Sequence, residues 1–324
     1  MGPREIFLNE WGRLRSGWRI AVFICLYLAI LFVVNNVLRV LYAVALNVGG
    51  YQPGQYLSNL IFRLTILLPA LLAGYICTRA LEGLPWRAIG LWFHQHWFAD
   101  FAIGSAIGSL SLLLAAGVAR VAGGLSFSIQ AKDVLRLALT MLISSAVLFI
   151  VAALAEEALF RGYPLQTLTR AKLAWLAVLL TSVPFAAVHL WNPNVVRGFT
   201  FANTALAGIW LALAYLRTRS LWFPVGIHWA WNWTLDSVLG LPVSGITISS
   251  HPLFRGVDLG PAWLTGGSYG IEGGAACTIA LVASTLFVWR TKLVSATPEM
   301  LKLTSGENPA PSRLLSVVPR QNDV

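Results

Sequence analysis

Charged residues are scarce in this chain of 324 residues: Asp, Glu, Lys and Arg make up 11% of it, whereas 57% is hydrophobic. A soluble domain carries about a quarter charged residues. The mean hydropathy of +0.71 comes with uncharged apolar runs of nearly 20 residues, the length that crosses a bilayer. The low charge therefore argues against a soluble domain and predicts an integral membrane protein surrounded by lipid bilayer.

Acidic residues are the scarcer of the two signs, with 13 Asp and Glu against 23 Lys and Arg. A net charge of +10 can indicate nucleic-acid binding, but in an apolar chain it is typical of cytoplasmic loops that face anionic lipid. We therefore predict no nucleic-acid partner. The distribution of Lys and Arg over the loops favours a cytoplasmic N-terminus and a cytoplasmic C-terminus, and hence an even number of spans.

Cysteine and common hydrolase motifs are also rare. The three cysteines, Cys25, Cys77 and Cys277, lie in apolar runs without CxxC spacing, which predicts buried apolar side chains rather than disulfides or metal ligands. Neither SxxK nor HExxH occurs. Serine hydrolysis and ordinary zincin hydrolysis are therefore disfavoured.

Eight apolar segments predict an all-α fold, a polytopic bundle of about eight transmembrane helices. The fourth is too long for one straight crossing, so it must tilt, leave the membrane early, or kink near Gly162 or Pro164. No internal repeat is visible. The eight segments are Trp18–Val34, Leu57–Cys77, Phe98–Val118, Leu139–Leu168, Leu173–Leu190, Phe201–Leu216, Leu221–Leu239 and Ala275–Trp289.

Two adjacent glutamates stand in the fourth segment, in "EEALFR". On a helix Glu157 and Arg161 are four residues apart with the acid first, which favours an ion pair. Glu156 lies about 100° further round and cannot share that arginine equally. One carboxylate is therefore expected to be held by Arg161 and the other to be free. The alternative is a solvated helix end, although ionisable residues inside a membrane usually have a function.

Two later segments carry histidines: His189 in "FAAVH", one turn after Phe185, and His228 in "HWAWN", on one helix face with Asn232. Taken singly, each also fits a structural histidine or a hydrogen-bonded helix contact. Counted from the basic loops at 1.5 Å per residue, these side chains and Glu156 lie at depths of roughly 14 to 25 Å. Those depths overlap within a hydrocarbon core of about 30 Å, so the residues are expected to converge.

This set of side chains suits hydrolysis. A glutamate in a low-dielectric cavity can act as general base on water. A histidine can orient that water or bind a metal, and a second histidine with an asparagine amide can donate hydrogen bonds to an oxyanion.

The three motifs resemble EExxxR, FxxxH and HxxxN of the CAAX prenyl endopeptidase and bacteriocin-processing (CPBP) family of intramembrane proteases. The resemblance covers about 139–239 and implies eight helices around a cavity open to the cytoplasm. It implies Glu156 as general base, His189 as its partner on the water, and His228 with Asn232 as oxyanion hole. Glu157 and Arg161 would brace the site, with Phe185 packed beneath His189. Members cleave prenylated CAAX proteins, process peptides or confer bacteriocin immunity.

The resulting hypothesis is an intramembrane endopeptidase of the bacterial plasma membrane that acts on membrane-associated or lipidated peptides. Glu156, His189 and His228 could complete a three-ligand zinc site, or work without metal. The alternatives are a non-catalytic immunity or binding protein and a proton-coupled transporter, although transporters usually show repeated halves. The organisation expected is a cytoplasmic segment at 1–17, three helices at 18–134, a catalytic core at 135–240, an outer loop with the last helix at 241–290, and a disordered cytoplasmic tail at 291–324.

Overall fold

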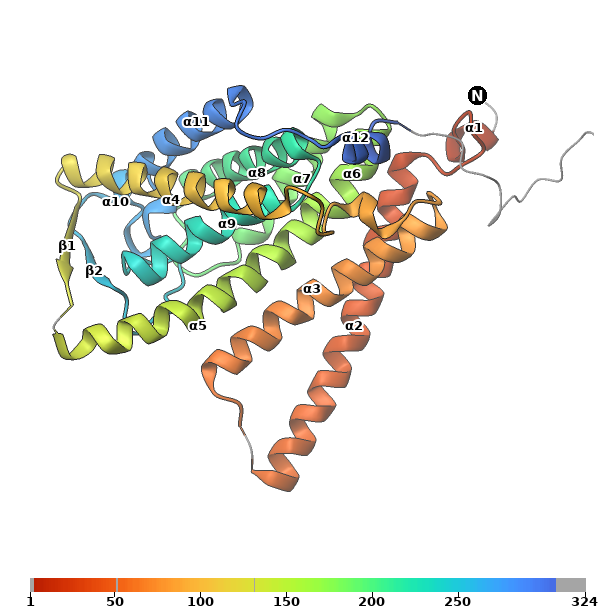
Figure 1. Cartoon of the computed structure of the whole chain (residues 1–324). Coiled ribbons are helices and arrows are strands. Elements are labelled where there is room, and N and C mark those ends of the chain that lie inside the picture. The colour runs from red at the N-terminus through yellow and green to blue at the C-terminus, as the bar shows by residue number, and fades with distance from the viewer. Residues whose placement is uncertain (1–2, 51, 131, 307–324) are drawn as a thin grey trace, which may run out of the picture.

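Helices make up most of the structure, a computed structural model that describes residues 3–50, 52–130 and 132–306 (Figure 1). Every predicted apolar segment is helical. Five helices are long and apolar enough to cross a membrane, and α7 and α11 are apolar but shorter. The chain is thus a mostly helical membrane protein, while the count of eight spans and their orientation stay predictions. The main helices are α2 (Ser16–Gly49), α3 (Gln55–Ala80), α4 (Trp97–Val121), α5 (Lys132–Glu157), α7 (Ala174–His189), α8 (Phe199–Thr218), α9 (Trp222–Trp233) and α11 (Ala275–Arg290).

The fold is mostly helical, as predicted, and it also contains one short pair of strands that the sequence did not predict. Strands β1 (Leu125–Ile129) and β2 (Phe254–Asp258) form an antiparallel pair. They join the connection between α4 and α5 to the long connection between α9 and α11. In this pair β1 alternates hydrophobic and serine residues, a period of two that suits a short strand.

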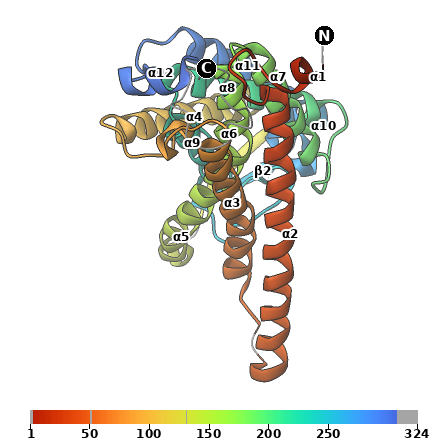
Figure 2. The same cartoon turned by 90° about the vertical axis from the view of Figure 1, so that its right-hand side faces the viewer.

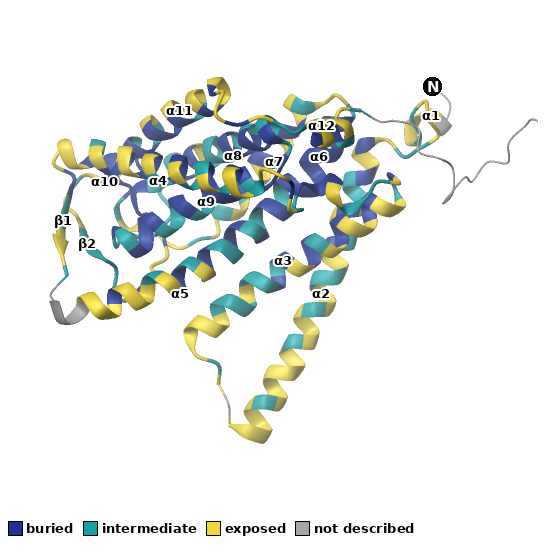
Figure 3. Ribbon diagram, viewed as in Figure 1, coloured by how far each residue is buried: buried dark blue, intermediate teal, exposed yellow. Residues whose placement is uncertain are grey.

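Helices α2 and α3 form a hairpin that diverges from the remaining helices (Figures 1 and 2). Helix α2 ends at Gly49, well beyond the predicted Val34, because its polar residues do not interrupt it: the side chains of Asn35 and Asn36 donate to backbone carbonyls one turn earlier, at 3.0 and 2.7 Å. Its 34 residues measure about 51 Å, more than a hydrocarbon core. Most of the hairpin is exposed (Figure 3), as expected of a surface that faces lipid.

Helices α4 and α9 pack closely because glycines line their contact. A Cβ at Gly104 would stand 2.4 Å from the Phe223 carbonyl oxygen, and one at Gly108 would stand 2.2 Å from that of Ile227. Small residues allow such close approach in membrane helices, where packing rather than water exclusion holds helices together. This contact fixes the position of α9 immediately before His228.

A buried ion cluster holds the base of the hairpin. Glu82, just after α3, pairs with Arg19 of α2 at 3.3 Å and also pairs with Arg170. It accepts a further hydrogen bond from Thr167. Both Thr167 and Arg170 lie on α6 (Tyr163–Arg170), the short helix that continues the fourth segment, so this cluster ties the hairpin to the core.

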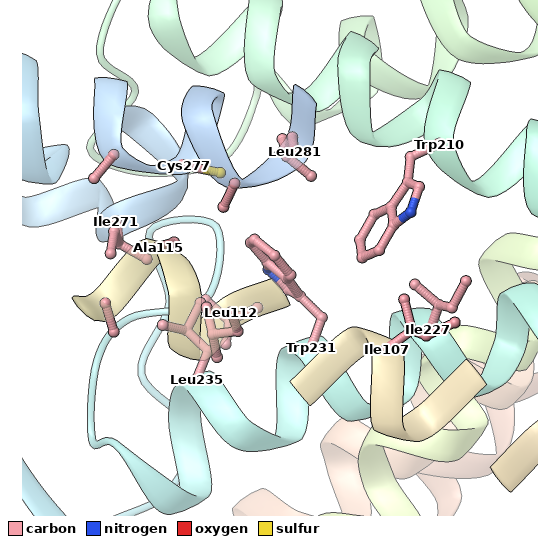
Figure 4. Packing of buried hydrophobic residues seen from close by; sticks show 14 of the residues in the cluster. Ile107, Leu112, Ala115, Trp210, Ile227, Trp231, Leu235, Ile271, Cys277 and Leu281 are labelled. Carbon is pink, nitrogen blue, oxygen red and sulfur yellow. The ribbon is translucent and has the colours of Figure 1, made fainter. Parts of the chain in front are cut away.

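The main hydrophobic core lies between α4, α8, α9 and α11, and Figure 4 shows its side chains. Trp231 of α9 meets Trp210 of α8 edge to face, with ring centroids 5.8 Å apart. Cys277, predicted to be buried, contributes to this core and Cys77 is also buried, whereas Cys25 is exposed.

The tail expected at 291–324 is not disordered where the structure describes it. Pro298–Thr304 form helix α12, with Thr297 as its N-cap. Met300 is fully buried and accepts a hydrogen bond from the Trp92 indole, and Glu299 pairs with Arg87. Residues 307–324 of the predicted tail lie outside the described residues. The remaining short helices are α1 (Pro3–Phe7), η1 (Trp86–Ile89), η2 (Ala158–Gly162), η3 (Thr234–Val238), α10 (Ala262–Thr265), η4 (Gly267–Tyr269) and η5 (Ile271–Gly273).

Candidate active site

The two glutamates lie at the end of α5, where the helix changes its winding. Ala158–Gly162 form a π-helical turn, η2, and α6 begins at Tyr163. A π-helical turn is rare, and such turns are frequent at functional sites. The π-helical turn therefore lies in the region where the sequence suggested a kink, around Gly162 and Pro164, and it separates the glutamates from α6.

Glu157 is fully buried between two partners. Its Oε1 atom lies 3.1 Å from Nη1 of Arg161, the pair expected from their spacing. The same oxygen lies 2.9 Å from Nδ1 of His228. Arg161 also donates to the Gly208 carbonyl oxygen at 3.2 Å, and its guanidinium lies 4.3 Å from the Phe185 ring centroid. Glu157 therefore joins α5 to α9, a link the sequence spacing did not reveal.

Glu156 faces two imidazoles. Its Oε2 atom lies 3.7 Å from Nε2 of His228 and 3.9 Å from Nε2 of His189. Within the described chain this oxygen is buried and has no hydrogen-bond partner. The separate positions of the two carboxylates agree with the division of the pair expected from helix geometry.

The other nitrogen of each histidine is already occupied. Nδ1 of His189 lies 2.7 Å from the Phe185 carbonyl oxygen, which can only accept. Nδ1 of His228 lies 2.9 Å from the Glu157 carboxylate. Each Nδ1 must therefore carry a proton, so a neutral imidazole presents its Nε2 lone pair to Glu156. Phe185 further contacts the His189 ring, with centroids 4.6 Å apart.

These groups border a cavity of about 440 Å³. Glu156, His189, His228, Asn232 and Phe185 all line it, whereas Glu157 and Arg161 are buried behind its wall. The sequence thus identified residues that share one cavity, while their catalytic roles stay predictions. The wall is mostly apolar, and its aromatic and aliphatic members include Tyr27, Phe62, Ile66, Phe149 and Leu159.

Arg63 of α3 is a further site residue, and it lies outside the three sequence motifs. Its Nη1 atom lies 3.6 Å from Oε1 of Glu156, and it lines the same cavity. The signal was present: Arg63 is the one charged residue in Leu57–Cys77. An ionisable residue isolated in an apolar span usually has a polar partner inside the protein.

The spacing of the donor atoms bears on the hypothesis of a zinc site. In the described part of the chain, no three His, Cys, Asp or Glu side chains have the arrangement of a metal site. Donors of a tetrahedral zinc ion stand about 3.3 Å apart, given bonds of about 2.0 Å. The separations of 3.7 and 3.9 Å from Glu156 to His228 and His189 are wider. As placed, the side chains of Glu156, His189 and His228 do not fit zinc.

One pentapeptide does match the GxSxG pattern of serine hydrolases: Gly266–Gly270 reads GGSYG. The pattern marks a nucleophile only at a turn from a strand into a helix. Here it covers the 3-10 turn η4, between two short helical turns. Ser268 is exposed and does not line the cavity, so this match does not indicate a serine nucleophile.

Comparison with known proteins supports the predicted resemblance. Residues 138–234 match the family model described as type II CAAX prenyl endopeptidase Rce1-like, which confirms the likeness to CPBP proteases over this segment. The family that this model describes consists of CAAX-type proteases. A segment of 84 residues is 37% identical to an uncharacterized 24.3 kDa protein of Escherichia coli, and covers 25% of this chain and 37% of that relative. No solved structure matches the chain significantly.

Proposed function

We propose that this protein is an intramembrane endopeptidase of the CAAX type, which hydrolyses membrane-associated or lipidated peptides in a bacterial plasma membrane. One observation carries the proposal: the unpartnered Oε2 of Glu156 faces Nε2 of both His189 and His228 in one cavity. Oε2 of Glu156 and Nε2 of His189 accept hydrogen bonds, and at 3.9 Å they are too far apart to bond one another. A water molecule supplies the donors such a site needs, and two acceptors 3.9 Å apart can share one water.

In this mechanism Glu156 takes a proton from the water while the oxygen attacks the peptide carbonyl carbon. His189, held by Phe185, accepts the second hydrogen bond of that water and orients it. The oxyanion lies against Asn232, whose amide makes no hydrogen bond to other described residues, and against His228. An imidazolium at His228 donates from Nδ1 to Glu157 and from Nε2 to the oxyanion. Glu156 then returns the proton to the leaving amine.

The apolar wall of the cavity favours a substrate peptide that carries an apolar group. Tyr27 of α2 and Phe62 and Ile66 of α3 contribute to its wall, so the exposed hairpin and the catalytic residues border one space. A lipidated tail or a transmembrane peptide has the apolar surface that such a wall covers. This is the basis for proposing membrane-associated substrates.

The test uses the purified full chain in lipid nanodiscs with a library of membrane peptides, and reads products by mass spectrometry. We expect wild type to cleave a subset of the library, and Glu156→Gln and His189→Ala to lose those products. The matched control is Glu299→Gln, which removes an exposed carboxylate that pairs with Arg87. Identical product profiles for wild type and both site variants would refute the protease proposal and leave the immunity or transport alternatives.

A further inference from the structure

Glu272 is a second carboxylate on the wall of the catalytic cavity. It lies in η5, before α11, where a charged residue at the start of a helix is ordinarily exposed to solvent. The structure instead makes it half-buried. Among the described residues that line the cavity, Glu156 and Glu272 are the two carboxylates.

The Glu272 side chain is fixed by three donors. Its Oε1 accepts from the Trp231 indole at 2.8 Å, and its Oε2 accepts from the backbone N–H and the hydroxyl of Ser244 at 2.6 and 3.0 Å. The backbone is held as well, because the Asn203 amide donates to the Glu272 carbonyl oxygen at 2.8 Å. A carboxylate offers about four acceptor positions, so this one retains capacity for a further donor.

In the described part of the chain Glu272 has no cationic partner, unlike three other glutamates that are buried or partly buried. Glu156 lies beside Arg63, Glu157 beside Arg161, and Glu82 beside two arginines. Across the described ranges, Glu272 has no ion pair. Asp236 has none either, but it is buried away from the cavity and is occupied by the backbone N–H groups of residues 248 and 249 and by serine hydroxyls.

The neighbours of Glu272 on the cavity wall are neutral. Ser244 donates to the Glu272 carboxylate and Asn203 to its backbone carbonyl oxygen, and these groups can solvate a charged ligand but cannot neutralise Glu272. Asn192 and Thr204 line the same cavity and are also uncharged. A cation that enters the cavity therefore meets one uncompensated carboxylate, whose attraction is strengthened by the low-dielectric surroundings.

The position of Glu272 relates it to the reacting bond. Trp231, its indole partner, comes three residues after His228 on α9, a rise of about 4.5 Å. An extended peptide covers that rise in one to two residues, at about 3.3 Å each. Glu272 and His228 line the same cavity, so a lysine or arginine side chain of a bound peptide can point toward Glu272.

We propose that Glu272 is a specificity subsite that binds a cationic group of the peptide substrate, within about two residues of the scissile bond. The proposal rests on the protease function and deepens it. The cation is a basic side chain or a free amino terminus, and the test distinguishes these sources.

The test uses membrane-anchored peptides that the wild-type protein cleaves, each made with lysine, norleucine or glutamate at the positions flanking the cleavage site. Norleucine keeps the length of lysine without its charge. Each peptide is also made with a free and an acetylated amino terminus. We expect lysine, or the free amine, to raise kcat/KM by at least about tenfold over its neutral counterpart at one position.

Glu272→Gln removes the charge and keeps the size. We expect it to abolish that preference while kcat/KM for the neutral peptide changes less than about twofold. Glu272→Lys should reverse the preference toward the glutamate peptide, an outcome that a purely structural role for Glu272 does not produce. Glu299→Gln, the control, should retain the wild-type preference.

Binding to the catalytically inactive Glu156→Gln protein is measured with the same peptides, so the subsite is tested even where cleavage is not seen. Equal binding of lysine and norleucine peptides, or an unchanged preference in Glu272→Gln, would overturn the subsite. Absence of all cleavage with a preserved binding preference would instead refute the protease function and leave the cation site standing.

Discussion

Oε1 of Glu157 lies 2.9 Å from Nδ1 of His228, so the buried Glu157 at the end of α5 holds a side chain of α9 in place. The same oxygen lies 3.1 Å from Arg161. Glu157 thus fixes which nitrogen of His228 is protonated and toward which side the other nitrogen points. This relationship separates the roles of two residues that are adjacent in sequence, and it leads to the first prediction.

Removal of the Glu157 carboxylate should mainly lower stability, whereas removal of the Glu156 carboxylate should mainly lower activity. Glu157→Ala leaves Arg161 buried without its counter-charge, which costs about 3–5 kcal/mol in the free energy of unfolding. Glu156→Gln keeps the size of a side chain that lines the cavity, and should cost less stability than Glu157→Ala while activity is lost. Unfolding in detergent and peptide cleavage measure the two quantities. Equal loss of stability in both variants would contradict the assignment.

Asn232→Ala tests the oxyanion role. A donor that acts on the transition state contributes to kcat rather than to substrate binding, so kcat should fall about 10²–10³-fold with little change in KM. Steady-state kinetics on one cleaved peptide give both constants. Asn36→Ala, on the exposed part of α2, is the control and should have wild-type kinetics. A rise in KM at constant kcat would assign Asn232 to substrate binding instead.

The metal content of the purified protein and its activity after chelation test whether zinc is bound. The wide separations between Glu156 and the two histidines predict that the purified protein binds no stoichiometric zinc, and that a chelator leaves cleavage unchanged. Elemental analysis and activity after chelation measure this. One zinc per chain, lost in both His189→Ala and His228→Ala, would show that the ligands close around a metal.

The contact between α4 and α9 predicts opposite effects for two glycines of one helix. Gly108→Ala places a methyl group against the Ile227 carbonyl and should destabilise the protein by about 1–3 kcal/mol. Because Ile227 precedes His228, activity should fall as well. A Cβ at Gly117 meets nothing within 4 Å, so Gly117→Ala should stabilise by about 0.5–1 kcal/mol and keep activity. Thermal unfolding of the pair, with cleavage rates, provides the check; similar behaviour of both would contradict the packing.

The burial of His94 predicts that the stability of the protein depends on pH. Burial lowers the pKa of His94 below its ordinary value, and the nearby His96 lowers it further, while Glu299 opposes the shift. Below about pH 6.5 the unfolded chain therefore binds a proton that folded His94 does not bind, so the contribution of His94 to stability falls on acidification. Unfolding measured between pH 7.5 and 5.5 should show a smaller loss for His94→Gln than for wild type. Identical losses would show that other groups cause the dependence.

Much of the candidate site could be predicted because helical spacing is a local property. The four-residue intervals between Glu157 and Arg161 and between His228 and Asn232 set which side chains share a helix face, whatever surrounds the helix. Apolar segment length likewise predicted the helices. The end of α2 was missed because Asn35 and Asn36 bond to their own backbone and let the helix continue, a choice that polarity alone does not reveal.

By itself the sequence determined a helical membrane protein and a set of chemically matched residues at similar depths. Only the tertiary structure decided their partners: Arg63 beside Glu156, His228 on Glu157, and Glu272 on the cavity wall. The physical reason is that each of these contacts joins different elements. Their positions depend on how closely neighbouring helices approach, as at Gly104 and Gly108, and the period of a single helix carries no information about that distance.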